Sequence, residues 1–215
     1  MPTRSERRSK RPGGDSTGTY IAIGVVSVVV IVAVAFALLV GMPGSGDSDF
    51  DPAEYSVQVT GSQLPRLGAS GDPTVGSQAP TVAGTDFDGN AVTLSPVGEP
   101  TVILFLAHWC PHCQNEVRWL SPWLEENGLP ESVRVVSVAT SIDATRPNYP
   151  PNDWLNDAGW PVPVIVDDQQ ETVAAYFGLN AFPFWVVLDG DGTVLERFTG
   201  ELEVDQFAQL IDEIS

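Results

Sequence analysis

The stretch that decides the fold is HWCPHC, residues 108–113, which holds the only two cysteines of the chain. A continuous apolar run, TVILFLA at 101–107, precedes it, and a mostly polar stretch with periodic apolar residues follows at 114–126. The cysteine pair is therefore expected where a buried strand turns into a helix. There, unpaired backbone N–H groups and the helix dipole favour thiolate over thiol. The two-residue spacing lets the second sulfur fold back, so that a disulfide can close and reopen.

Each residue of this stretch has an expected role. Cys110 is the expected nucleophile, with its sulfur facing solvent, and Cys113 is expected deeper, as the resolving thiol that releases a mixed disulfide. His112, between the sulfurs, can stabilise the Cys110 thiolate and make the disulfide more oxidising. His108 is expected to be an exposed loop residue. Trp109 is expected to form an apolar platform beside the reactive sulfur, where substrate binds.

The N-terminal region is expected to anchor the chain in a membrane. Residues 1–19 carry five of the ten basic side chains and two of the 28 acidic ones, and are expected to form a disordered cytoplasmic tail. Residues 20–40 are almost unbroken apolar, long enough to span a bilayer, and longer than the core of a cleaved signal peptide. The basic flank predicts a single-pass protein of the cell membrane, with the following domain on the extracytoplasmic side.

The remainder of the chain is strongly acidic. Residues 41–74 are rich in Gly, Pro, Ser and Asp and are expected to form an extracytoplasmic linker, with one short strand at 55–60. Beyond the apolar segment the chain has five arginines, no lysine and 26 acidic residues, so this part is more negative than the net charge of −18 that the whole chain carries. Such a surface repels nucleic acid and anionic lipid, so neither is an expected partner.

Residues 75–215 read as one α/β domain. A hairpin is expected at 85–94 across the turn Asp88-Gly89-Asn90, and a helix from Cys110 that ends or kinks at Pro122. Alternating β and α elements, then a hairpin and a helix, predict a mixed central sheet with helices on both faces. The further strands are expected at 101–107, 133–139, 162–166, 184–188 and 193–198, and the further helices at 153–158, 171–177 and 204–214.

Several motifs in order resemble the thioredoxin superfamily. WCPHC at 109–113 stands where thioredoxins carry Trp-Cys-x-x-Cys, and the hairpin with residues 91–94 after the turn is similar to membrane-anchored TlpA/ResA-type proteins. The dipeptide Pro111-His112 is that of DsbA-type oxidases. The resemblance covers roughly residues 75–215 and implies a thioredoxin-like fold and thiol–disulfide oxidoreductase activity, with no cofactor and no resident metal. It also implies a cis bond before Pro183, facing the disulfide, with Phe182 beside the bound substrate.

One position departs from the thioredoxin pattern. Thioredoxin carries a buried Asp six residues before its first cysteine, where it helps to move the proton of the deep thiol. Leu104 holds that position here. Glu116 or another carboxylate would have to approach in space to serve instead.

The sequence thus predicts a thiol–disulfide oxidoreductase that exchanges disulfides with exported proteins through Cys110 and Cys113. Pro111-His112 favours an oxidant that donates disulfides and is reoxidised by a quinone-linked membrane partner. The TlpA/ResA-like framework favours a reductant, for example of apocytochrome c cysteines, which needs a transmembrane electron donor. Two alternatives remain: a copper or zinc module that uses the cysteines with His108 or His112, and a scaffold with a permanent structural disulfide.

Overall fold

The central strand β4 (Thr101–Leu106) lies where the apolar run predicts it, and all six of its residues are buried. It pairs in parallel with β5 (Arg134–Ala139) and antiparallel with β7 (Phe184–Leu188). Strands β6 (Val164–Val166) and β8 (Val194–Thr199) complete a mixed sheet with the order β6-β5-β4-β7-β8. The predicted mixed sheet is confirmed. The computed structural model describes residues 50–68, 71–95 and 98–215.

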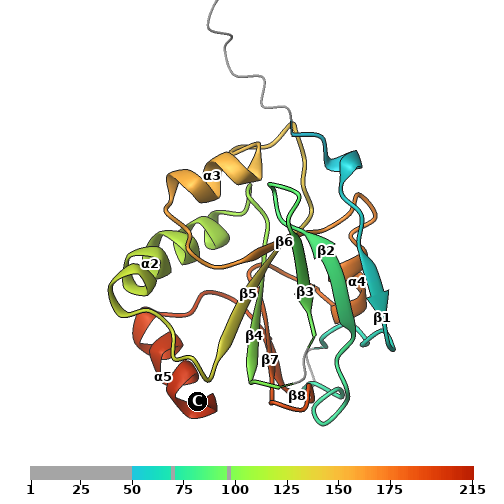
Figure 1. Cartoon of the computed structure of the whole chain (residues 1–215), viewed down its shortest axis with the longest axis vertical. Coiled ribbons are helices and arrows are strands. Elements are labelled where there is room, and N and C mark those ends of the chain that lie inside the picture. Colours follow the sequence, from blue (N-terminus) through green and yellow to red (C-terminus); the bar gives the residue numbers. More distant parts are fainter. Residues whose placement is uncertain (1–49, 69–70, 96–97) are drawn as a thin grey trace, which may run out of the picture. The chain divides into compact units, whose positions relative to one another are not determined.

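Helices cover both faces of this sheet, as predicted (Figure 1). Because successive strand residues point to opposite faces, Leu104 packs on one side of β4 and Phe105 on the other. The core around Leu104 takes in side chains of three helices, whereas the core around Phe105 takes in one helix and a second, smaller sheet. The helices on the Leu104 side are α2 (Pro111–Asn127), α3 (Pro151–Asp157) and α5 (Val204–Ile214). The helix on the Phe105 side is α4 (Thr172–Phe177).

Helix α2 starts directly after Cys110, with Pro111 at its first position, where a missing backbone N–H has no cost. The helix does not end at Pro122 but continues to Asn127. Pro122 is exposed, and so is Arg118, whose carbonyl loses its helical partner at this point. The helix accommodates Pro122 because this side is exposed, so that water can bind the Arg118 carbonyl in place of the missing backbone N–H.

The described part of the expected linker belongs to the domain. Residues from 50 onward lie in the same compact unit as the rest of the chain to Ser215. Strand β1 (Gln58–Thr60) pairs with β2 (Thr81–Thr85), which pairs with β3 (Ala91–Leu94). A short 3₁₀ helix, η1 (Pro52–Glu54), precedes them. The strand expected at 55–60 is present as β1. This part is more than a tether, because its apolar residues, Val57, Val59, Leu64 and Leu67, pack against the core on the α4 side.

A buried ion pair fastens this N-terminal segment to the sheet. Arg197 on β8 is 3% exposed and donates from Nη2 to Asp72 at 2.6 Å and from Nε at 2.8 Å. Its Nη1 donates to the carbonyls of Pro65 and Phe177, at 3.0 and 2.7 Å. The guanidinium thus joins the segment before β2 to both α4 and β8.

The membrane expectation concerns residues that the structure does not describe. The expected tail at 1–19 and anchor at 20–40 both lie outside the described residues. Among the helices that are described, none has the length and apolar character needed to span a bilayer.

We expect Asp72→Asn to lower the free energy of unfolding by about 3–5 kcal/mol, because it leaves the Arg197 charge buried without its partner. The ion pair lowers the Asp72 pKa to about 2, so its stabilisation is complete above pH 4 and is lost as the pH falls through 2. Urea unfolding at pH 7 measures the change. The control Arg66→Met, an exposed cation of the same segment, should stay within about 0.5 kcal/mol of wild type. A loss below 1 kcal/mol for Asp72→Asn would contradict this expectation.

Candidate active site

The two cysteines lie at the junction of β4 and α2, in the dithiol form. Cys110 is the N-cap residue of α2, and Cys113 lies in its first turn. Cys110 keeps 6% of its surface exposed and Cys113 none. The predicted order of depth is therefore confirmed, but Cys110 does not face solvent openly, because it packs in the same apolar cluster as Trp109 and Phe182.

The surroundings drive the pKa values of the two thiols apart. A hydrogen bond from Cys113, with backbone N–H groups of Cys113 and His112 and the charge of His112, lowers the pKa of Cys110 to about 6. Burial raises the pKa of Cys113 far above its usual range. Near neutral pH, Cys110 is a thiolate and Cys113 a thiol. This asymmetry supports the predicted nucleophile and resolving thiol.

His112 is exposed on the first turn of α2, and its Nδ1 forms an ion pair with Oε1 of Glu201. Contact with Glu201 raises the pKa of His112 above its usual value. Glu201 lies in the loop between β8 and α5 and also accepts from Asn115 Nδ2 at 3.2 Å. The sequence offered no signal for Glu201, which is 89 residues from His112.

Helix α2 carries a buried acid, Glu116, whereas strand β4 has Leu104 in the position of the thioredoxin acid. Leu104 is fully buried, and Glu116 on α2 is fully buried as well. The backbone N–H of Leu202 donates to Oε2 of Glu116 at 3.0 Å, while Oε1 has no partner among the described residues. Burial raises the Glu116 pKa to about 8, and its charge acts on Cys113. Glu116 therefore carries a proton near the deep thiol at neutral pH.

Trp109 and Phe182 meet beside the reactive thiol. Their rings pack edge to face with centroids 5.9 Å apart, and the indole N–H of Trp109 donates to the Ser141 carbonyl at 2.7 Å. The Arg146 guanidinium carbon lies 4.4 Å from the Trp109 ring centroid. The two aromatic residues predicted to bind substrate are thus brought together, in the apolar cluster that also contains Cys110. Their role in binding stays a prediction.

The bond between Phe182 and Pro183 is cis, as the resemblance implies. The Pro183 carbonyl accepts from the backbone N–H of Gly200 at 3.0 Å. The loop before β7 is therefore joined to the loop that carries Glu201. A second cis bond, between Tyr149 and Pro150, was not expected.

His108 is buried, so its expected exposure is wrong. Its Nδ1 lies 2.7 Å from the Pro147 carbonyl, and its Nε2 accepts from the backbone N–H of Asp143 at 3.2 Å. Burial lowers the His108 pKa, which favours the neutral ring. The imidazole thus pairs with the backbone of the loop before α3, which sequence alone does not reveal.

The same contacts argue against a metal site built on His108. A metal ligand needs a free ring nitrogen, and both nitrogens of His108 face backbone groups. Over the described ranges, no three His, Cys, Asp or Glu side chains gather in a way that could hold a metal ion.

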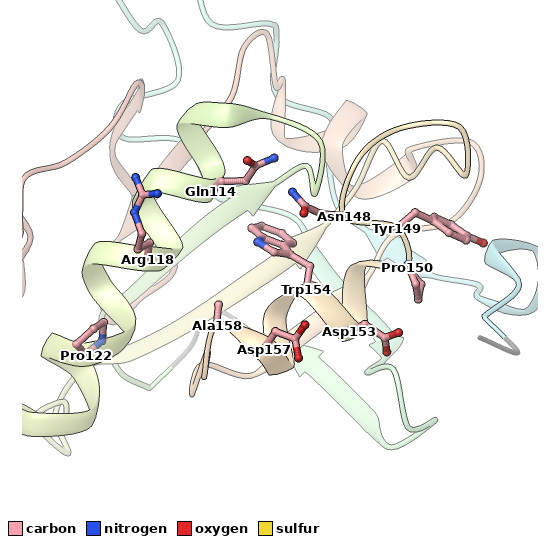
Figure 2. Close-up of a pocket in the computed structure, with 10 residues that line it drawn as sticks. All are labelled: Gln114, Arg118, Pro122, Asn148, Tyr149, Pro150, Asp153, Trp154, Asp157 and Ala158. Atoms are coloured by element: carbon pink, nitrogen blue, oxygen red, sulfur yellow. The ribbon is translucent and has the colours of Figure 1, made fainter. Parts of the chain in front are cut away.

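A cavity of about 620 Å³ opens between α2 and α3, beside the cysteine turn (Figure 2). It reaches the active site through Gln114, which follows Cys113, and Asn148; both side-chain amides donate to the His108 carbonyl. Trp154 lies in the space between the two helices. The lining residues are Gln114, Arg118, Pro122, Asn148, Tyr149, Pro150, Asp153, Trp154, Asp157 and Ala158.

A low-pKa thiol at a helix start is paired here with a buried thiol and directly follows Trp109, whose ring packs on Phe182 before the cis-proline. Such a pair can attack a disulfide and then release the product. On a mixed sheet with helices on both faces, this arrangement defines a thioredoxin-like domain built for thiol–disulfide exchange.

The chain belongs to the Redoxin family, which it matches over residues 74–211. It is 26% identical over 145 residues to the thiol-disulfide oxidoreductase ResA of Bacillus thuringiensis (strain Al Hakam), covering 66% of this chain and 79% of the relative. It is 26% identical over 117 residues to the thiol:disulfide interchange protein DsbE of Haemophilus influenzae, covering 54% of this chain and 60% of that relative. The crystal structure of a putative DsbE from Chlorobium tepidum superposes with a TM-score of 0.54 at 21% identity, covering 66% of this chain and 98% of that one. The protein is a thiol–disulfide oxidoreductase that acts on protein thiols and disulfides.

We expect Cys110→Ala to abolish disulfide exchange and Cys113→Ala to accumulate a mixed disulfide with a protein substrate, because Cys113 is the enzyme thiol that resolves the disulfide between Cys110 and the substrate. Non-reducing electrophoresis with mass spectrometry identifies the trapped bond. Turnover that persists in Cys110→Ala would show that the nucleophile is wrongly assigned.

We expect Glu116 to make a contribution to the free energy of unfolding of the reduced protein that falls between pH 5 and pH 8, because unfolded Glu116 loses its proton near pH 4.5 and folded Glu116 holds it until about pH 8. The lowered pKa of Cys110 contributes in the opposite direction, so the contribution of Glu116 is read from the difference between variant and wild type. This component is at most about 4 kcal/mol over those three pH units. Glu116→Gln should remove it. Urea unfolding at pH 5 and pH 8 measures the slope, that is, the change in the free energy of unfolding between the two pH values. Glu125 is exposed on the same helix, and the control Glu125→Gln should leave this slope as in wild type. An equal slope in Glu116→Gln and wild type would refute the assignment.

Proposed function

We propose that this chain is an extracytoplasmic oxidant, which donates the Cys110–Cys113 disulfide to exported proteins. The observation that carries the proposal is the ion pair of His112 with Glu201 beside a thiol whose pKa is lowered to about 6. A stabilised Cys110 thiolate favours the reduced enzyme and so makes its disulfide a stronger oxidant.

The chemistry follows from the two unlike sulfurs. A substrate thiolate attacks the Cys110 sulfur of the enzyme disulfide, a mixed disulfide forms, and Cys113 leaves with the electron pair. Because Cys113 has a raised pKa, it takes up a proton, which the protonated Glu116 beside it can supply. A second substrate thiolate then attacks the substrate sulfur of the mixed disulfide and releases the Cys110 thiolate. Two electrons pass from substrate to enzyme, and the substrate gains a disulfide.

A reductant is the second candidate, and the similarity to ResA favours it. The same steps then run backward: the Cys110 thiolate attacks a substrate disulfide, and Cys113 gives up its proton to resolve the mixed disulfide. Glu116 would accept that proton in the fraction of molecules in which it is ionised, and its raised pKa, about 8, makes that fraction a better base. Apocytochrome c cysteines are a candidate substrate in this direction.

The proposed location rests on the sequence. Residues 20–40 serve as a single-pass anchor, with the basic residues 1–19 in the cytoplasm and the catalytic domain outside. The domain then depends on a redox partner in the membrane. An oxidant needs a quinone-linked oxidase, and a reductant needs a donor that carries electrons across the bilayer.

The reduction potential of the Cys110–Cys113 pair decides between the two directions. We expect a value more positive than about −200 mV, on the oxidising side of the glutaredoxins, because the Cys110 thiolate is stabilised. Equilibration of the purified protein with glutathione buffers at pH 7 measures it. A value more negative than about −200 mV would reject the oxidant in favour of the reductant.

A further inference from the structure

The loop between β8 and α5, residues 200–203, contacts the active site at three separate points. The backbone N–H of Gly200 donates to the Pro183 carbonyl at 3.0 Å. The side chain of Glu201 binds His112, and the backbone N–H of Leu202 donates to Glu116 at 3.0 Å. One short loop thus reaches the cis-proline loop, the histidine between the sulfurs and the buried acid.

Glu201 is held in place by more than its ion pair. Its Oε1 also accepts from Asn115 Nδ2, at 3.2 Å, one turn along α2 from His112. The Glu201 side chain is only 20% exposed, whereas that of His112 is 68% exposed. An ion pair between two mobile side chains in water gains little free energy, because both must be ordered. Here the carboxylate is already fixed and partly desolvated, so only the imidazole has to be ordered.

The other charges near His112 do not replace this partner. The Cys110 thiolate also favours the imidazolium, but it exists only in the reduced enzyme. On α2, Glu116 is buried and protonated near neutral pH, and Arg118 donates to Asn115. In the loop, the Glu203 side chain caps the start of α5 instead.

We propose that Glu201 is a positioning residue of the exchange reaction: it holds His112 as an imidazolium beside Cys110 and thereby sets the pH range over which His112 stabilises the reactive thiolate. The proposal rests on exchange through Cys110 and applies to either direction of electron flow. With Glu201, His112 keeps its charge to a higher pH than an imidazole without this partner, because the carboxylate raises its pKa. Without it, the charge and its effect on Cys110 are lost at a lower pH.

A double-mutant cycle isolates this effect. Wild type, His112→Ala, Glu201→Gln and the double variant, each as the full chain, are equilibrated with glutathione at pH 5.5 and pH 7.5. The contribution of His112 is the ratio of the equilibrium constants for disulfide reduction with and without the imidazole. The repulsion between Glu201 and the thiolate is present in both proteins of one ratio and absent from both proteins of the other, so it cancels within each ratio.

At pH 7.5 we expect the His112 ratio to be about two- to fivefold larger with Glu201 than in the Glu201→Gln background, the range of an exposed ion pair. At pH 5.5 the two ratios should agree, because the imidazole is protonated in both backgrounds. Asp205→Asn removes the same charge from an exposed position at the start of α5, and should leave the ratio unchanged at both pH values.

Nuclear magnetic resonance of the imidazoles gives an independent readout. The chain has two histidines, so the signals of His112 are assigned by their loss in His112→Ala. Glu201→Gln should move the titration of His112 to lower pH, and Glu201→Asp, which keeps the charge, should restore part of the shift.

The proposal is overturned if the His112 ratio at pH 7.5 is the same with Glu201 and in the Glu201→Gln background. It is also overturned if the two ratios differ by as much at pH 5.5 as at pH 7.5, or if Glu201→Gln leaves the titration of His112 unmoved. A wild-type protein that fails to equilibrate with glutathione would instead refute the exchange function. In that case the titration of His112 still tests its pairing with Glu201.

Discussion

The complete burial of Cys113 in the first turn of α2 is the constraint on which the site depends. Strand β4 is buried along its whole length, so the helix that follows it packs its first turn into the same apolar cluster. Burial keeps Cys113 protonated, and a protonated Cys113 donates a hydrogen bond to Cys110. The reactivity of Cys110 therefore depends on the burial of Cys113, since the hydrogen bond from Cys113 is the largest influence on the pKa of Cys110.

Two carboxyl groups act around this thiol pair in opposite environments. Glu116 is buried and holds its proton near Cys113, whereas Glu201 lies at the surface and pairs with His112. One carboxyl group can therefore exchange protons near neutral pH, and the other provides a fixed charge. The loop 200–203 joins them, because Leu202 donates to Glu116 and Glu201 binds His112.

The sequence predicted the framework well, because local patterns fix it. Helix α5 has the predicted limits, and Gly178 ends α4 with a positive φ of 74°. Expectations failed where a distant contact decided the outcome. The segment around β1 looked like a linker from its composition, yet it joins the domain through pairing with β2 and through the Asp72–Arg197 ion pair, whose members are 125 residues apart.

The sequence by itself determined the chemistry: two cysteines at a strand–helix junction, with a histidine between them, specify a redox pair through short-range geometry and the helix N-terminus. It also showed that Leu104 stands where thioredoxin has its acid, and it named Glu116 or another carboxylate as a group that could approach in space instead. Only the tertiary structure decided that Glu116 is buried beside Cys113, that His108 supports a loop, and that Glu201 pairs with His112. The physical reason is that burial and charge pairing depend on segments that folding brings together, and no local pattern in the sequence records which segments will meet.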